Sequence, residues 1–189
     1  KYDNVAKHIH LPAQSGSTRI LEKMNRTYTR EWYEERINRI KELMPECSIS
    51  SDIITGFCSE TEEDHQATLS LMKWVEYEFS YMYFYSERPG TLAARKYEDD
   101  VPEEIKKRRL TEVIEAQHEV AKRKNKAQEG KVHRVLIESR SKKNPDEWMG
   151  RNEQNIKVIF PKENYQKGEY VNVHIDRTTI TSLIGVAVE

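Results

Sequence analysis

The chain has 189 residues, of which 33% are charged and 37% hydrophobic, and its formal net charge is −1. This length fits one large or two small domains, and the near-neutral balance gives no whole-chain argument for binding nucleic acid or membrane. There is neither an apolar run of about eighteen residues nor a signal-peptide pattern, and two cysteines fit a reducing compartment better than a disulfide scaffold. We therefore expect a cytoplasmic protein that has no membrane partner.

The first two-thirds of the chain alternates strand and helix patterns. Strands are predicted at residues 8–13, 49–57 and 79–86, and a turn at residues 88–91. Helices are predicted after the cap residues Ser17, Thr29 and Thr61 and after Pro102, the last running to about residue 128. Strands separated by helices imply parallel βαβ units, so the fold class of this part is α/β.

About three βα units cannot close a (β/α) barrel, which typically needs eight strands and about 250 residues. The chain also begins without Met and enters a strand almost at once. We therefore expect a partial barrel that is a fragment of a longer protein, a natural start trimmed by processing being the alternative. The edge of the 8–13 strand could pair with another chain, whereas the full-length protein is expected to be a monomer.

After Gly130 the pattern changes to short strands without helices. They are predicted at residues 131–138, 156–160, 169–176 and 183–188, with residues 148–151 as a possible fifth. Several short strands separated by turn signals are typical of a small antiparallel β-barrel. The predicted domains are therefore residues 1–128 and residues 129–189.

Polar residues occur where predicted parallel strands end, which is the usual ligand face of an α/β barrel. Gln14 stands in HLPAQSGS, and its amide can both donate and accept; a simple Ser-Gly turn with a helix cap is the alternative. Asp52 lies inside an apolar strand, so it needs a ligand hydroxyl or a partner such as Arg26. Arg88 could bind an anion or could belong to a solvated turn.

A basic stretch joins the two predicted domains. Residues 122–143 hold nine Lys or Arg against two acids, a local charge of +7. Backbone phosphates are natural partners of such a patch, and a solvated helix end is the alternative. We expect RNA contacts from Lys124, Lys126, Lys131, Arg140, Lys142, Lys143 and Arg151.

Four motifs in order, HLPAQSGS, LEKMNRTYTREWYEERI, SDIITGFCSETEED and FYSERPGT, resemble the second half of a radical S-adenosylmethionine methylthiotransferase. Gln-Ser-Gly-Ser and Arg-Pro-Gly-Thr are most similar to the MiaB type, which modifies tRNA. The last sixty or so residues, with SKKNPDEWMGRNEQNIKVIFP, resemble the TRAM domain, a small OB-like RNA-binding barrel. The resemblance covers essentially the whole chain.

The resemblance implies a reaction on tRNA. A methylthio group is added to C2 of isopentenyl-adenosine 37, next to the anticodon, by a protein that uses S-adenosylmethionine and two 4Fe-4S clusters. The cluster cysteines of the family should lie upstream of Lys1, so no metal ligand is expected in this chain and the fragment alone should be inactive. The anticodon stem-loop is the expected RNA partner, and these motifs identify no sulfur donor.

The resemblance also implies roles for residues of this chain. Asp52 would bind ribose hydroxyls, Arg26 the methionyl carboxylate and Gln14 either of them, while Gly56 and Phe57 would shape the adenine-side wall. A guanidinium suits a carboxylate because it binds through paired hydrogen bonds.

The chain departs from the family at two places. Cys58 and Ser59 replace a Pro-Gly pair, which should loosen the loop and require ordinary backbone angles of it. Leu92 stands where the family usually has Pro. Cys58 has no second ligand at metal spacing, so we do not expect it to carry chemistry. The rival interpretations are a methylthiotransferase acting on threonylcarbamoyl-adenosine or on a ribosomal protein, and a non-catalytic RNA-binding protein.

Overall fold

The computed structural model describes residues 5–189, and the chain divides into two compact units. The first unit comprises residues 10–45 and 49–120. The second comprises residues 5–9, 46–48 and 121–189. Within the described residues, no helix has both the length and the apolar character needed to cross a membrane.

A three-stranded sheet organises the first unit, in the order β1 (His8–His10), β2 (Ser48–Thr55) and β3 (Phe79–Phe84). β2 and β3 are parallel, as predicted. β1 is shorter than predicted: the Leu11 N–H still donates to the Ser50 carbonyl, but the next donor facing β2, the Ala13 N–H, donates to Ser51 Oγ in place of a backbone carbonyl. The chain nevertheless stays beside β2 as far as Gln14, which bridges Ile53 in parallel.

The predicted capped helices are confirmed: α1 (Thr18–Lys23), α2 (Arg30–Leu43) and α3 (Glu62–Val75). They follow Ser17, Thr29 and Thr61, whose side chains accept hydrogen bonds from backbone N–H groups three residues ahead. The long helix predicted after Pro102 is α5 (Glu103–Lys126). The short α4 (Leu92–Lys96) was not predicted, and it begins just after the Arg88–Thr91 turn.

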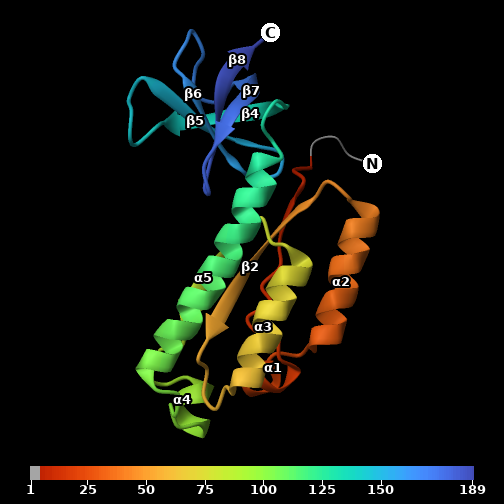
Figure 1. Cartoon of the computed structure of the whole chain (residues 1–189), viewed down its shortest axis with the longest axis vertical. Coiled ribbons are helices and arrows are strands. Elements are labelled where there is room, and N and C mark those ends of the chain that lie inside the picture. Colours follow the sequence, from red (N-terminus) through yellow and green to blue (C-terminus); the bar gives the residue numbers. More distant parts are fainter. Residues whose placement is uncertain (1–4) are drawn as a thin grey trace. The chain divides into compact units, whose positions relative to one another are not determined.

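Helices α2, α3 and α5 cover one face of the sheet, and Figure 1 shows them running alongside β2. The core of this face includes Ile37, Ile53, Leu71 and Val113, each at most 1% exposed. On β3 the alternating residues Phe79, Tyr81 and Tyr83 point to the opposite face and are 48%, 50% and 56% exposed. We call this opposite side, which carries His10, Asp52 and these three aromatic side chains, the bare face.

Five strands close into a barrel in the second unit, in the order β4-β5-β6-β8-β7. They are β4 (Val132–Arg140), β5 (Glu147–Asn152), β6 (Lys157–Pro161), β7 (Tyr170–Thr178) and β8 (Leu183–Val188). The barrel and its fifth strand are confirmed, with one difference: β6 and β8 are parallel. A closed ring with an odd number of strands cannot alternate direction throughout, so at least one neighbouring pair must be parallel.

Alternate residues of each barrel strand point inward and form one core. Val135, Ile137, Phe160, Val173 and Ile175 are each at most 1% exposed. This period of two is the one expected of β-strands that have one face buried. The barrel therefore has a complete apolar interior within its own residues.

Candidate functional site

A cavity of about 620 Å³ opens at the carboxyl ends of β2 and β3. Three of the five predicted cofactor residues line it: Gln14, Arg26 and Phe57. Asp52 and Gly56 do not belong to its lining. The end of the sheet where this cavity lies is the one the sequence predicted.

Gln14 reaches the cavity through an unusual backbone conformation. Its φ angle is +66°, a left-handed value that non-glycine residues seldom adopt. Two backbone hydrogen bonds of 2.9 Å hold it there, one to the carbonyl of Asp52 and one from the N–H of Ile54. The residue is 6% exposed, and its side-chain amide makes no hydrogen bond to any described residue. An unpartnered amide in such a place is available to a ligand.

The turn after Gln14 is fixed against α3. The N–H of Gly16 donates to Thr68 Oγ1 at 2.9 Å, and a Cβ at Gly16 would lie 2.4 Å from the carbonyl oxygen of Ala67. Ser17 Oγ donates to Asp64 Oδ1 at 2.6 Å while capping α1. The turn-and-cap alternative is therefore right for residues 15–17, and this packing holds the neighbouring Gln14 in place.

Asp64 is the anchor of this arrangement, and it was not among the residues predicted to form the site. Arg19 pairs with its carboxylate, and Ser17 and Thr61 donate to it. Although burial raises the pKa of Asp64, the hydrogen bonds from Arg19, Ser17 and Thr61 outweigh it and hold that pKa well below its usual range. The carboxylate therefore stays ionised and joins α1 to the start of α3.

The cavity lining is cationic. Lys23, Arg26 and Arg88 contribute positive charge, and no Asp or Glu belongs to the lining. Lys23 donates to Ser59 Oγ at 2.7 Å, whereas the exposed Arg26 guanidinium has no ion-pair partner among the described residues. A free guanidinium beside an apolar wall is suited to a carboxylate or phosphate group.

Asp52 does not meet Arg26. Its Oδ1 lies 3.6 Å from His10 Nε2, and His10 Nδ1 in turn lies 2.9 Å from Ser50 Oγ. Asp52 is on the bare face, opposite Tyr81 and two residues before Ile54, which lines the cavity. Its side chain is thus on the cavity side of the sheet, one pleat away from the cavity lining, and its neighbour is a histidine.

Gly56 sets the loop after β2. Its φ angle is +68°, and a Cβ there would lie 2.3 Å from Lys106 Cγ, so only glycine fits. Its N–H donates to Glu60 Oε1 at 2.7 Å, and Glu60 pairs with Arg109 at 2.9 Å, both side chains being buried. Burial raises the pKa of Glu60, while the Gly56 N–H and Arg109 act against that shift. Sequence reasoning missed this pair because its members are 49 residues apart.

Phe57 and Cys58 continue this loop. The Phe57 ring meets the Tyr85 ring edge-on, with the centroids 4.8 Å apart. Cys58 packs beside Ile20 and Phe57, and burial raises the pKa of its thiol. A buried, protonated thiol is a poor nucleophile.

One expectation about this loop is wrong. Ser59 does not take ordinary backbone angles but has φ +59°. It keeps a left-handed conformation at the position where the family usually has glycine. Its N–H donates to Asp100 and its Oγ to the carbonyl of Cys58, and these two bonds stabilise the strained residue.

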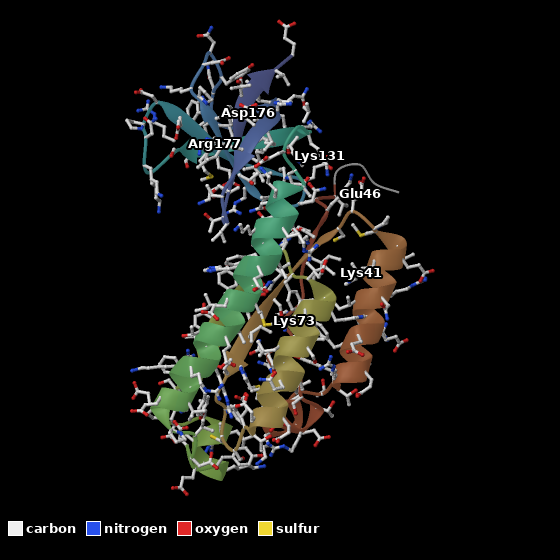
Figure 2. The ribbon with its side chains drawn as sticks, in the orientation of Figure 1. Lys41, Glu46, Lys73, Lys131, Asp176 and Arg177 are labelled. Carbon is white, nitrogen blue, oxygen red and sulfur yellow. The ribbon has the colours of Figure 1, made fainter. Side chains whose placement is uncertain are left out.

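The basic residues of the second unit fall into two kinds. Arg140, Lys142 and Lys143 are exposed at the β4–β5 hairpin and have no ion-pair partner among the described residues. By contrast, Lys126 pairs with Glu129 at 2.5 Å, and Arg151 lies 3.4 Å from Glu138. Lys124 is in the last turn of α5, and Lys131, labelled in Figure 2, precedes β4. The hairpin thus carries the least neutralised part of the predicted RNA surface.

Two family models match parts of this chain. Residues 1–72 match the model of the Radical SAM superfamily, and residues 126–188 match that of the TRAM domain. The tRNA-2-methylthio-N(6)-dimethylallyladenosine synthase of Amoebophilus asiaticus is 57% identical over 97% of this chain, and those of Christiangramia forsetii and Flavobacterium johnsoniae are 55% identical over 97% and 100% of it. The chain is a homologue of these synthases. The resemblance seen in its motifs is confirmed.

The chain spans 38% to 39% of the length of these three relatives. Among solved structures, coproporphyrinogen III oxidase (HemN) from Escherichia coli, a radical SAM enzyme, aligns with 78% of this chain and 41% of its own chain. The two are 15% identical, with a TM-score of 0.49.

Proposed function

We propose that the protein containing this chain methylthiolates tRNA at C2 of N6-isopentenyl-adenosine 37, next to the anticodon, in the cytoplasm. The homology to the named synthases over nearly the whole chain is the observation that carries this proposal. The cavity at the end of the sheet and the basic barrel surface support it. In this proposal, residues from about 129 onward bind RNA, and the preceding residues contribute to the cofactor cavity.

The lining of the cavity fits S-adenosylmethionine. Arg26 would bind the methionyl carboxylate. The unpartnered amide of Gln14 would either donate to the same carboxylate or exchange hydrogen bonds with the ribose hydroxyls. Phe57 provides an apolar wall for the adenine, and Gly56 sets the backbone behind it. Asp52, which lies two residues before the cavity-lining Ile54 on the same face of the sheet, would bind the ribose hydroxyls.

Bound there, S-adenosylmethionine together with two 4Fe-4S clusters held by residues outside this chain would supply radical and sulfur-transfer chemistry. The residues of this chain bind, orient and exclude water. The cationic lining draws the carboxylate end inward, and the aromatic wall keeps the opposite end dry. We propose that the full-length protein acts as a monomer on the anticodon stem-loop.

The activity is tested by mass spectrometry of tRNA nucleosides from a strain lacking the full-length gene. We expect the methylthio group to disappear from isopentenyl-adenosine and to return when the gene is restored. If the mark persists in the deletion strain, the proposed function is wrong. If the methylthio group is lost from threonylcarbamoyl-adenosine or from a ribosomal protein instead, a rival methylthiotransferase is supported. If no methylthio group is lost although the protein binds tRNA, a non-catalytic RNA-binding protein is supported.

The cavity assignment is tested by Arg26→Gln in the full-length protein. We expect the Kd for S-adenosylmethionine, measured by equilibrium dialysis, to rise at least about ten-fold, because a charge-assisted bond to a carboxylate is lost. Arg39→Gln is the matched control, since Arg39 is exposed on α2 and pairs only with Glu42 among the described residues. Equal binding by both variants would contradict the assignment of Arg26.

The RNA surface is tested by reversing the charge of Lys142 and Lys143 together. We expect weaker binding to an anticodon stem-loop and a flatter dependence of affinity on salt, because fewer counterions are released. Unchanged affinity in this double variant would remove the hairpin from the RNA surface.

A further inference from the structure

An exposed aromatic side chain on the barrel stands in a row of cations. Tyr170, the first residue of β7, is 57% exposed, and the Arg134 guanidinium carbon lies 4.1 Å from the centre of its ring. Val135 and Val171, the next residues of the two strands, point into the core. Because side chains alternate along a strand, Arg134 and Tyr170 project outward from the barrel.

The strand register extends this pair into a row across four strands. Tyr170 on β7 stands opposite Leu136 on β4, which stands opposite Arg151 on β5, which stands opposite Lys157 on β6. Neighbouring strands are about 4.8 Å apart, so Tyr170 and Arg151 are separated by roughly 10 Å. We call Tyr170, Arg134, Leu136, Arg151 and Lys157 the outward row.

The charge of the outward row favours a polyanion. It has three cations, and the acid that meets it is Glu138, which lies 3.4 Å from Arg151. Glu169, next to Tyr170, accepts from the backbone N–H of Gln166. Asp176 on β7 lies six residues beyond Tyr170, roughly 20 Å along the strand. A protein partner that buried this row would need its own acidic side chains to pair with the three cations, whereas the phosphates of a nucleic-acid backbone pair with them directly.

An aromatic ring stacked on a guanidinium is a surface that nucleobases recognise. Unpaired bases stack on aromatic rings or on guanidinium planes, and backbone cations contact the adjoining phosphates. One ring face of Tyr170 is taken by Arg134, so a base would continue the stack on the far side of either group. Leu136, which lies between Tyr170 and Arg151 in the outward row, adds an apolar contact for the sugar or the base edge.

We propose that Tyr170 and Arg134 form a stacking platform for one unpaired base of the bound RNA, and that Arg151 and Lys157 contact the flanking phosphates. This inference rests on the proposed tRNA substrate and adds a base-stacking site to a surface so far described only by charge. Arg151 was expected to bind RNA from the sequence; Tyr170, Arg134 and Lys157 were not assigned.

The test uses the full-length protein and its tRNA, with affinity measured by filter binding at several salt concentrations. We expect Tyr170→Ala to weaken binding at least about five-fold, since stacking on one aromatic side chain contributes that much or more per base, and to leave the salt slope unchanged. Tyr170→Phe should bind like wild type because it keeps the ring. The double variant Arg151→Gln with Lys157→Gln should instead flatten the slope by roughly 1.5.

Two controls keep the outcome clear. Ile180→Ala removes another exposed apolar side chain of the same unit outside the outward row and should bind normally; thermal melting of each variant reports folding. If Tyr170→Ala is folded and binds tRNA like wild type, the platform is wrong, whatever the state of the proposed function. If wild-type protein methylthiolates no tRNA while Tyr170→Ala still weakens RNA binding, the proposed function fails and the platform stands. If Tyr170→Ala weakens binding of a co-purified protein but not of tRNA, the platform is also wrong.

Discussion

The barrel closes its sheet on itself, whereas the three-stranded sheet of the first unit leaves one face and two outer strands without a neighbour among the described residues. Every barrel strand pairs on both sides, and one core fills the interior. In the open sheet, β1 and β3 each pair on one side only, and aromatic residues of β3 are about half exposed on the bare face. The barrel's own residues supply all its strand pairing and fill its core, and those of the open sheet do not.

This difference explains where side chains that are available to ligands are found. In the barrel, candidate ligand groups are on the outer surface because the interior is filled. In the sheet unit they lie on the bare face and at the strand ends, where the side chains of Gln14 and Arg26 line the cavity and make no hydrogen bond or ion pair with a described residue. An open edge leaves polar groups available to ligands, and it leaves apolar rings exposed as well.

The largest expected effect separates the barrel core from the bare face of the sheet. Phe160→Ala removes a ring that is 1% exposed inside the barrel and should lower the free energy of unfolding by about 3–5 kcal/mol. Tyr83→Ala removes an exposed ring of the bare face and should change it by less than about 0.5 kcal/mol. Urea unfolding followed by hydrogen exchange, which reports each unit separately, measures both. Equal losses would show that Tyr83 is not at an open surface.

The next effect comes from the buried ion pair beneath the cavity loop. Arg109→Met should lower the free energy of unfolding by about 3 kcal/mol, because Glu60 would be left buried and unpaired. Adding Glu60→Gln should recover part of this loss. Hydrogen exchange of residues 56–64 should be fastest in Arg109→Met, slower in the double variant and slowest in wild type. Additive losses in the double variant would mean that the two side chains do not act as a pair.

The same carboxyl predicts a pH trend. Burial raises the pKa of Glu60 above its ordinary value of 4.5, so the folded protein holds this proton to higher pH than the unfolded chain does. Stability from this group therefore falls as pH rises above about 4.5. In Arg109→Met the fall should be steeper, since the guanidinium no longer favours the ionised form. Unfolding curves of wild type and variant between pH 4 and pH 8 measure the difference.

Asp64 gives the opposite sign and a smaller effect. The pKa of its carboxyl is lowered, so its contribution is present above the ordinary value of 3.8 and is lost as pH falls below it. Asp64→Asn should cost about 1–3 kcal/mol at pH 7 and remove this acid-dependent loss. Glu98→Gln, an exposed change in the same unit, should leave the acid profile unchanged. An acid profile unaffected by Asp64→Asn would contradict the anchoring role.

The two regions also differ in how far the sequence predicted them. The barrel strands were predicted as short segments between turn signals, without a helical pattern, and both of these are local signals. The helices of the first unit were predicted from caps such as Thr61 and Ser17, since a cap is a local signal. The parallel β6–β8 pair was missed because it follows from closure, a property of the whole ring.

The site was predicted less completely than the fold. Gln14, Arg26 and Phe57 were predicted because ligand residues follow parallel strands and because their motifs resemble a known family. They line the cavity, and their contact with a cofactor stays a prediction. The Glu60–Arg109 pair and the Arg19–Asp64 anchor join residues more than forty positions apart, which no local pattern contains. Ser59 was misjudged because local propensity disfavours a left-handed serine, and hydrogen bonds from the surrounding structure override that preference.

The smallest expected effect on stability concerns the bare face, and it tests the contrast directly. Tyr81→Ser with Tyr83→Ser should change the free energy of unfolding of the 189-residue chain by less than about 0.5 kcal/mol, because both rings are half exposed. It should nevertheless reduce self-association of this chain, measured by sedimentation, since exposed rings on an open sheet favour contact between copies. Val186→Ser, which replaces an exposed apolar side chain of the closed barrel, should change neither quantity. If self-association persists in the double variant, pairing at the edge of β1 becomes its source, and a proline at His8 should then abolish it, because proline cannot donate to a neighbouring strand.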